Sequence, residues 1–348
     1  MGILARFASL AAASGVAVAT LVPGGAAYAQ ATGTVERAEL SPMERVPQVR
    51  ADYLAEQGED EGSRVFGGME AQPGAHPFQV ALLTKDYLDN DPMSQFNAQF
   101  CGGSLIAPEW VLTASHCVVD EQGTVPANSI SILVGATDLT EGTRHDVAEV
   151  IAHPDYSMTT LNADIALIRL AKPADAPTIR IATDEVTAGA ATVTGWGRME
   201  DGYFPIRLMQ ADLELQQNAT CNAGLKDIYS RDIAGILTYW SGRMRYSPEG
   251  IVSAASALAG TMSDPLNETM LCAGTVDGMR DSCNGDSGGP LFMREGNDVV
   301  QVGVVSWGDG PVDAEVYCGH KGAYGVYSNV AHFAVWIAEN TGIAATAN

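Results

Sequence analysis

One stretch of the chain combines a serine, several glycines and two acidic residues in a spacing that suits nucleophilic chemistry. It covers residues 281–290, DSCNGDSGGP, and Ser287 stands between Asp286 and Gly288. A serine hydroxyl is a weak nucleophile, so it needs a base to take its proton and donors to hold the oxyanion that its attack creates. Glycine lets the backbone approach a substrate closely, which makes the N–H groups of Gly285 and Ser287 candidate donors.

His116 and Asp164 are the candidate partners of this serine. His116 lies in TASHC at residues 113–117, and an imidazole suits general-base work because its charge changes near neutral pH. Asp164 lies in NADIALI at residues 162–168, where an unpaired carboxylate would be costly to bury. Pairing with His116 removes that cost, and the acid then holds the imidazole tautomer and stabilises its cation.

These three stretches resemble the motifs around the catalytic His, Asp and Ser of the trypsin-like serine proteases, in that family's order along the chain. Further landmarks are GWG at residues 195–197 and SWG at residues 306–308, whereas Ser115 stands where the family usually has Ala. The resemblance runs from Val65 to about residue 339. It implies two six-stranded antiparallel β-barrels with a C-terminal α-helix, and an active site between the barrels.

Short apolar runs alternate with turn residues along the chain, and this pattern by itself predicts only an all-β fold. An Ala- and Gly-rich linker at residues 171–191 separates two sets of runs, so the resemblance implies an N-terminal barrel at about 65–182 and a C-terminal barrel at about 183–348. Residues 330–339 have the spacing of an amphipathic terminal helix. The expected strands are 79–84, 104–106, 110–114, 130–134, 147–152, 165–170, 191–195, 209–215, 290–293, 299–306 and 325–327.

The resemblance also assigns roles to single residues. Ser287 would attack the substrate carbonyl, His116 would take its proton, and an acyl-enzyme would form and be hydrolysed. Asp281, six residues before Ser287, occupies the position that floors the family's primary pocket, where an acid selects Arg or Lys. The other substrate-binding residues that the resemblance implies are Ser282, Ser306, Trp307, Gly308 and Gly325.

The cysteines indicate the compartment. Their number, six, fits three disulfides and an oxidising environment, although the sequence alone allows several pairings. No Cys-x-x-Cys pair and no clustered histidines support a metal site, so we expect no metal and no cofactor. The resemblance pairs Cys101 with Cys117, Cys221 with Cys272 and Cys283 with Cys318.

The charge balance limits the partners. With 42 acidic and 19 basic residues, the chain has a formal charge of −23. Such an excess argues against nucleic acid or an anionic membrane as a partner. It suits basic substrates, although an acidic surface that serves solubility alone explains it equally well.

The first 64 residues have the features of targeting and processing segments. An apolar run at residues 8–22, followed by Ala-Tyr-Ala at 27–29, predicts a signal peptide at 1–29 and a secreted, extracellular protein, with a retained anchor as the alternative. Residues 30–64 are polar and show no helical or strand period, and the composition changes sharply at Val65. This junction resembles the family's activation site. Cleavage after Arg64 would remove 30–64 as a propeptide from the peptidase domain at 65–348 and free the Val65 ammonium to pair with Asp286.

Three segments are longer than the family pattern: residues 85–99, 222–270 and 309–317. The second of them has helical potential around residues 228–239. Each is either surface decoration or an element that narrows substrate choice, because loops on a rigid scaffold often carry function.

The sequence therefore predicts a secreted, monomeric trypsin-like serine endopeptidase, made as a zymogen, that cleaves after Arg or Lys in proteins and peptides. Protein protease inhibitors are further expected partners. One alternative is a catalytically inactive homologue that binds partners through the same cleft, and another is an esterase with the same triad. The intact triad and Gly285 argue against the first, and Asp281 argues against the second because ester hydrolysis needs no cation pocket.

Overall fold

The computed structural model describes residues 41–57, 67–199, 202–296, 298–314 and 318–343. The expected signal peptide and the expected cleavage residues Arg64 and Val65 lie outside these ranges. Residues Ser41–Asn348 form one compact unit. Among the described helices, none has both the length and the apolar character that crossing a membrane requires.

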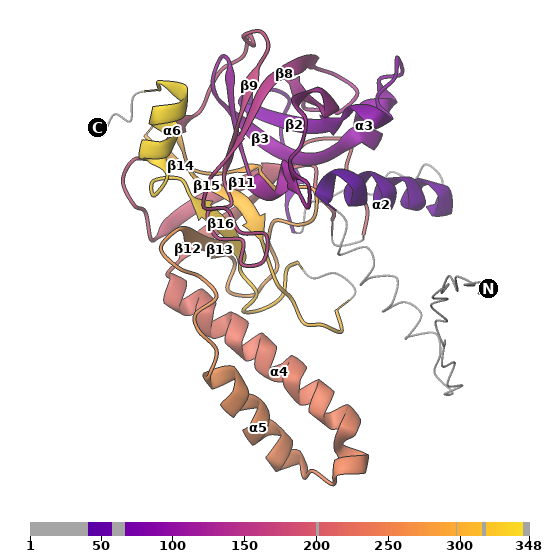
Figure 1. Ribbon diagram of the computed structural model, residues 1–348, viewed down its shortest axis with the longest axis vertical. Coiled ribbons are helices and arrows are strands. Elements are labelled where there is room, and N and C mark those ends of the chain that lie inside the picture. The colour runs from indigo at the N-terminus through magenta and orange to yellow at the C-terminus, as the bar shows by residue number, and fades with distance from the viewer. Residues whose placement is uncertain (1–40, 58–66, 200–201, 297, 315–317, 344–348) are drawn as a thin grey trace, which may run out of the picture. The chain divides into compact units, whose positions relative to one another are not determined.

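The first half of this unit is a closed antiparallel barrel with the strand order β2-β3-β4-β9-β8-β7 (Figure 1). Strands β2 and β7 are buried along their whole length, and their pairing closes the barrel. Short elements in its connections are η1 (Lys85–Tyr87), α3 (Met93–Ala98), η2 (Ser115–Cys117), β5 (Val119–Asp120), β6 (Gly123–Thr124) and η3 (Ala127–Ser129). The barrel strands are β2 (Gln79–Thr84), β3 (Gln99–Ala107), β4 (Trp110–Thr113), β7 (Ile130–Val134), β8 (Thr143–Ala152) and β9 (Ala166–Leu170).

The second barrel has the order β12-β11-β14-β15-β16-β13, and pairing of β13 with β12 closes it. Two short strands extend its sheet: β1 (Met69–Glu70) pairs with β12, and β10 (Arg180–Ile181) pairs with β15. Helix α6 (Ala334–Thr341) follows near the C-terminus. The barrel strands are β11 (Gly189–Gly195), β12 (Met209–Gln216), β13 (Met270–Gly274), β14 (Pro290–Glu295), β15 (Asp298–Trp307) and β16 (Gly325–Asn329). The expectation of two six-stranded antiparallel barrels with a C-terminal helix is confirmed.

Buried polar contacts and one helix join the two barrels. Thr194 Oγ1 donates to Gln79 Oε1 at 2.7 Å, and Ser104 Oγ donates to Gln301 Oε1 at 2.6 Å. All four side chains are buried and out of reach of water. These bonds therefore supply the partners that buried polar groups require. Helix α6 brings Trp336 to within 4.9 Å of the ring of His153 on the first barrel. These contacts fix the two barrels against each other.

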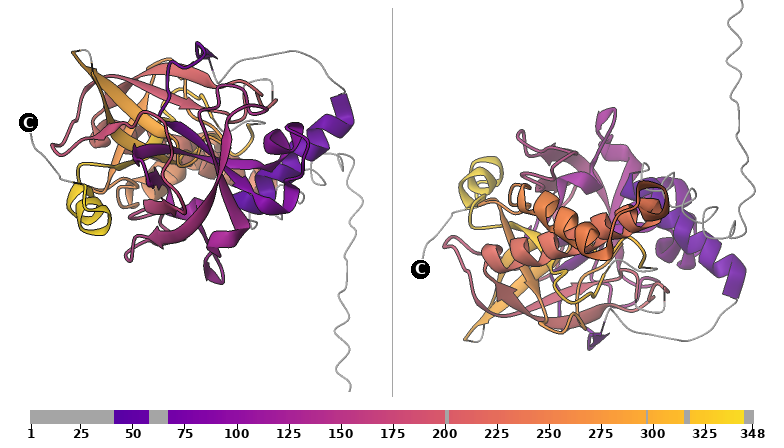
Figure 2. Two further views of the ribbon diagram at one scale, coloured as in Figure 1. Left: turned by 90° about the horizontal axis from the view of Figure 1, so that it is seen from above. Right: turned by 90° about the horizontal axis from the view of Figure 1, so that it is seen from below.

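The expectation that residues 30–64 lack a helical period is wrong for their second half, because residues Pro42–Gln57 form helix α2. Ser41 begins it, donating from N and Oγ to the carboxylate of Glu44, which resembles a capping box. Its buried stripe holds Val46 and Arg50, one turn apart. Met43 and Val49 also pack against the core, so apolar residues at 43, 46 and 49 do follow a helical spacing, which Pro47 and the buried Arg50 interrupt. Helix α2 lies beside α3 (Figures 1 and 2).

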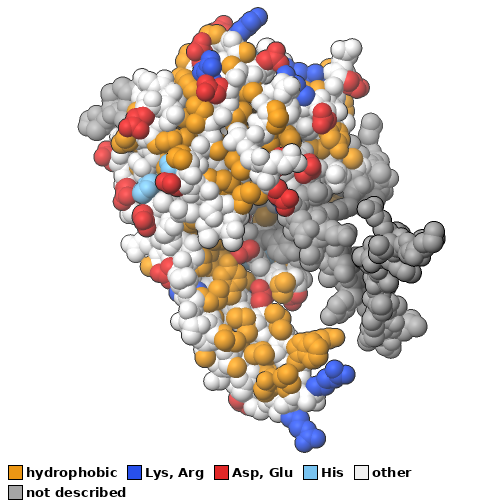
Figure 3. Space-filling model, in the orientation of Figure 1, with side chains coloured by type: hydrophobic (Ala, Val, Ile, Leu, Met, Phe, Trp, Pro, Cys, Tyr) orange, Lys and Arg blue, Asp and Glu red, His pale blue; other side chains and the backbone are white. Residues whose placement is uncertain are grey.

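The long insertion forms a hairpin of two helices, α4 (Asn218–Met244) and α5 (Pro248–Gly260). The helical potential at 228–239 is confirmed, but the helices extend well beyond it. They run side by side away from β12 and β13 (Figures 1 and 2). The disulfide Cys221–Cys272 ties the base of the hairpin to β13, while its outer part exposes apolar side chains (Figure 3). These include Ile236, Tyr239, Trp240, Met244 and Tyr246.

Limited digestion by an added Arg-specific protease should cut the hairpin first at its tip. Arg243 and Arg245 are exposed there, and Arg245 ends α4 with φ at 55°, whereas a protease needs an exposed and locally open chain. Arg231, in the middle of α4, is an internal control that should be cut later. Mass spectrometry identifies the cut, and gels with and without reductant test whether the Cys221–Cys272 disulfide holds the fragments together. First cuts elsewhere, or fragments that separate without reductant, would contradict this.

Candidate active site

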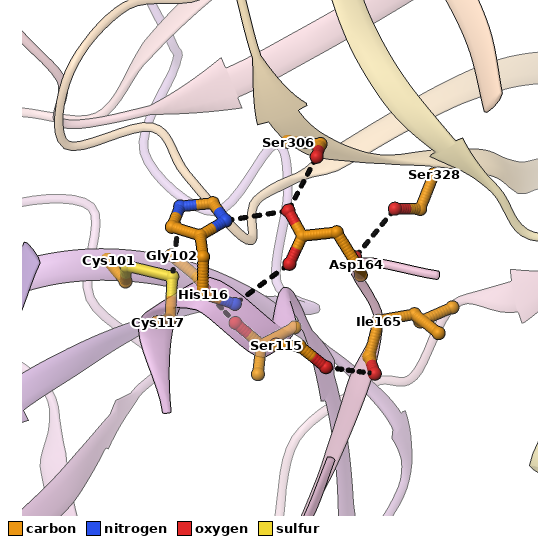
Figure 4. A network of polar contacts seen from close by, with 10 residues as sticks. Cys101, Gly102, Ser115, His116, Cys117, Asp164, Ile165, Ser306 and Ser328 are labelled. Atoms are coloured by element: carbon orange, nitrogen blue, oxygen red, sulfur yellow. Dashed lines mark hydrogen bonds and ion pairs between the residues drawn. A yellow bond between two sulfur atoms is a disulfide. The ribbon is translucent and has the colours of Figure 1, made fainter. Parts of the chain in front are cut away.

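His116 and Asp164 lie together at the junction of the two barrels (Figure 4). His116 sits in η2, just after β4, and Asp164 precedes β9. His116 Nδ1 lies 2.7 Å from Asp164 Oδ2, and the His116 backbone N–H donates to Asp164 Oδ1 at 2.8 Å. From the second barrel, Ser306 Oγ donates to Asp164 Oδ2 at 2.5 Å and Ser328 Oγ donates to the Asp164 carbonyl at 2.6 Å. The carboxylate is 1% exposed, so both barrels supply the bonds that a buried charge requires.

This arrangement fixes which nitrogen of His116 can act as a base. Because Nδ1 is engaged by the carboxylate, it holds the proton, and Nε2 is left as the acceptor. Ser115, the residue that departs from the family pattern, donates from Oγ to the Ile165 carbonyl at 2.6 Å and ties the histidine turn to the strand after Asp164.

Cys101, His116 and Cys117 form a cluster of metal-ligating residue types among the described residues. The disulfide Cys101–Cys117 occupies both sulfur atoms, and a metal binds the thiolate form of cysteine. The cluster is therefore not a metal site.

Ser287 lies in the loop before β14, against the first barrel. Its carbonyl accepts a hydrogen bond from the Gly102 N–H at 2.7 Å. Gly288 packs so closely that a Cβ there would lie 2.2 Å from Thr113 Oγ1, three residues before His116. Among the bonds of the described residues, none joins the Ser287 hydroxyl to His116. Such bonds are often long in a free enzyme and tighten when substrate binds.

The two peptide groups beside Gly285 are both held by hydrogen bonds. The Asn284 carbonyl accepts from the Arg198 N–H at 2.7 Å, and the Gly285 carbonyl accepts from Gln99 Nε2 at 2.9 Å. In a trans peptide the N–H points opposite to the carbonyl, so the bond to Arg198 turns the Gly285 N–H the other way. Gly285 has φ at 98°, a conformation that glycine adopts without strain.

Asp286 is a second buried acid, 2% exposed. Its Oδ1 accepts from the Gly197 N–H at 2.7 Å and its Oδ2 from the Cys283 N–H at 2.9 Å. Burial raises the pKa of Asp286 to about 6, although these N–H groups and the charge of Arg50 act in the opposite direction. A Cβ at Gly195 would lie 2.1 Å from Asp286 Oδ1, which explains one glycine of the GWG stretch.

Asp281 is a third buried acid, and two glycines lie near it. Its Oδ1 accepts from the Ser282 N–H at 2.8 Å and its Oδ2 from the Gly319 N–H at 3.2 Å. A Cβ at Gly325 would lie 2.5 Å from Asp281 Oδ1, and one at Gly308 would meet only the Gly325 Cα, at 3.9 Å. Burial raises the pKa of Asp281 to about 7, with the N–H donors opposing it.

Comparison of the sequence with known proteins shows the family. The family model for Trypsin matches residues 65–337. The chain belongs to the trypsin family. It is 33% identical to trypsin epsilon of Drosophila erecta over 282 residues, 79% of this chain and 86% of that protein. It is 30% identical to a tryptase of Mus musculus over 287 residues, 78% and 87% of the two chains. As a family member it is a serine-type endopeptidase, and trypsin-like proteases act on protein substrates.

The residues that sequence reasoning named for the site form two groups in the structure of this trypsin-family chain. His116, Asp164 and Ser306 are joined by hydrogen bonds, and Asp281, Ser282 and Gly325 lie together. Trp307 packs against the cluster that contains Cys221 and Cys272. The three disulfides are those that the resemblance implied, Cys101–Cys117, Cys221–Cys272 and Cys283–Cys318.

Two residues that contact the site were missed, and so was a third that holds one of them. Tyr327 on β16 lies 3.2 Å from Ser282 Oγ through its hydroxyl. Gln99 Nε2 donates to the Gly285 carbonyl, and Arg50 Nη2 donates to Gln99 Oε1. The polar glutamine at the start of an apolar strand was a weak signal for Gln99, and nothing in the sequence indicated Arg50.

Benzamidinium, a planar aromatic cation, should bind more weakly as the pH falls, because only the ionised Asp281 attracts it. With the carboxyl pKa raised to about 7, the free pocket is mostly ionised at about pH 8 and mostly neutral at about pH 5. One proton competes with one ligand, so the affinity should fall about 100-fold between these values. Binding near pH 6 should also release a proton, which calorimetry in two buffers measures.

Benzamide, which has the same shape without the charge, is the matched control and should show no such change. Equal affinity of benzamidinium at both pH values would show that Asp281 does not supply the charge in this way.

Proposed function

We propose that this trypsin-family protease hydrolyses peptide bonds after Arg and Lys. The buried carboxylate of Asp281 supports this most directly, because among the described residues it has N–H donors but no bonded cation. A basic side chain of the substrate would supply that cation, whereas a neutral one would leave a buried charge unpaired. Gly308 and Gly325 place no side chain in its path.

The chemistry proceeds through an acyl-enzyme on Ser287. His116 takes the proton of the Ser287 hydroxyl on Nε2 as the oxygen attacks the scissile carbonyl, and then delivers it to the leaving amine. Asp164 keeps Nδ1 protonated and stabilises the imidazolium. The N–H groups of Gly285 and Ser287 hold the oxyanion, and water then hydrolyses the ester with His116 again as the base. The bonds on His116, Asp164 and the peptides flanking Gly285 support these roles.

The protein is secreted as a zymogen and works as a monomer. The apolar run and Ala-Tyr-Ala motif of residues 1–29 support secretion. Cleavage after Arg64 frees Val65, whose ammonium pairs with the buried Asp286, and Arg64 itself suits the enzyme's own pocket. Protein inhibitors that present Arg or Lys bind the same cleft as substrates.

A peptide library should show cleavage after Arg and Lys that depends on Asp281. Asp281→Ser should lose at least about 1000-fold in kcat/KM on these peptides, because the basic side chain loses its only buried counter-charge. The activity on peptides with Phe should change far less, and the fold should be kept. Ser287→Ala, the control for contaminating proteases, should cleave neither. A parent enzyme that turns over Phe and Arg peptides equally would refute the proposed specificity.

The purified Ser287→Ala precursor should remain uncut on its own and be cut after Arg64 when active enzyme is added. The reason is that self-activation requires the nucleophile, while Arg64 remains a substrate for the wild-type pocket. N-terminal sequencing identifies the new end at Val65. If the pure Ser287→Ala chain is cut without added enzyme, the cleavage does not depend on Ser287, and self-activation by this active site is refuted.

A further inference from the structure

Arg50 of helix α2 is a fully buried arginine outside the stretch that matches the trypsin family. Its exposure is 0%, and its guanidinium lies between the rings of Phe96 and Phe204, 4.6 and 4.4 Å from their centroids. Burial lowers the pKa of Arg50 to about 9, and the charge of Asp286 acts against that shift. A buried charge persists only when it is paired and hydrogen-bonded, so its partners indicate what it does.

One path leads from Arg50 to Gly285. Arg50 Nη2 donates to Gln99 Oε1, which leaves the amide nitrogen of Gln99 facing the other way. That nitrogen donates to the Gly285 carbonyl at 2.9 Å and to the Cys101 carbonyl at 3.0 Å. Because an arginine can only donate, Arg50 fixes the orientation of the Gln99 amide and thereby supports the bond to Gly285.

A second path leads from Arg50 to Asp286. Arg50 Nη2 also donates to the Trp196 carbonyl at 2.8 Å. The N–H of the same peptide group, on Gly197, donates to Asp286 Oδ1 at 2.7 Å. Arg50 and Asp286 therefore hold opposite ends of one peptide group, and the two paths reach neighbouring residues of the loop 284–287, here the oxyanion loop.

We propose that Arg50 is a positioning residue for the oxyanion loop, and that helix α2 remains bound to the catalytic domain as a working part of the active site. The proposal rests on the proposed function, in which Gly285 donates to the oxyanion. Loss of α2 would leave the Gln99 Oε1 and Trp196 carbonyl acceptors without their Arg50 bonds in a buried place. Residues 30–64 contain no cysteine, so after a cut at Arg64 the attachment is non-covalent.

Arg50→Met, introduced in the full chain and assayed after cleavage at Arg64, should lower kcat about 100-fold, the loss that follows when one oxyanion donor is removed. KM and the affinity for benzamidinium should stay within about threefold, because Asp281 has no bond to either path. Arg45→Met is the matched control: Arg45 lies on the same helix, and no hydrogen bond or ion pair is described for its side chain. Its kcat should equal that of the wild type.

Two further variants separate positioning from a merely structural role. Arg50→Lys keeps the charge and should regain at least about tenfold of the lost kcat, because an ammonium still donates hydrogen bonds. Gln99→Met should lower kcat by itself, and adding Arg50→Met to it should cost less than in the wild type, because both act on Gly285 through one path. A purely structural effect would lower thermal stability and leave the kcat of the folded fraction unchanged.

Native mass spectrometry of the processed enzyme tests the retention of α2. A complex of the fragment that contains Arg50 with the domain that starts at Val65 supports the proposal, whereas full kcat in enzyme that has lost the fragment overturns it. Unchanged kcat in Arg50→Met overturns it too, and if that variant does not fold, unchanged kcat in Gln99→Met does so. Processed wild-type enzyme that does not react with a fluorophosphonate would instead refute the proposed function.

Discussion

The burial of the carboxylate of Asp286, directly before Ser287, is the constraint on which the region of the proposed active site depends. Asp286 is almost without solvent contact, so its negative charge needs donors and a cation from the protein. The N–H groups of Gly197 and Cys283 supply the donors, and the first of them requires glycine because a side chain would overlap the carboxylate. Meeting this requirement brings the GWG turn, the disulfide of Cys283 and the loop of Ser287 into one place.

Three buried acids near the barrel junction differ in the groups that bind their carboxylates. Asp164 accepts hydrogen bonds from His116 and from Ser306, which belongs to the other barrel. These bonds fix the carboxylate against the imidazole. Asp286 is bonded by two N–H groups and attracted by Arg50. Among the described residues, Asp281 takes hydrogen bonds from N–H groups only, and burial raises its pKa to about 7, compared with about 6 for Asp286. The same residue type therefore supports three roles because the environments differ.

The helical hairpin contacts the loop after Gly308 and is more than a surface addition. Tyr229 of α4 donates from its hydroxyl to Asp309 Oδ2 at 2.5 Å, and the Val312 N–H donates to Asp232 Oδ1 at 3.2 Å. Burial, followed by the bond to Asp309, raises the pKa of the Tyr229 hydroxyl. Glu315 of the same loop lies outside the described residues. The hairpin thus holds the loop after Gly308 in place.

The sequence by itself determined the family and predicted the residues of the proposed site, because His116, Asp164, Ser287 and Asp281 stand in short stretches whose types and order are specific. It also located most strands, since alternation of apolar and turn residues is a local property. It did not reveal β13, which directly follows the long insertion and is needed to close the second barrel. Only the tertiary structure decided that β13 pairs with β12, and that Arg50 is buried with a hydrogen bond to Gln99. Both depend on partners far away in the chain, and a polar side chain in a polar segment gives no local sign that folding will bury it.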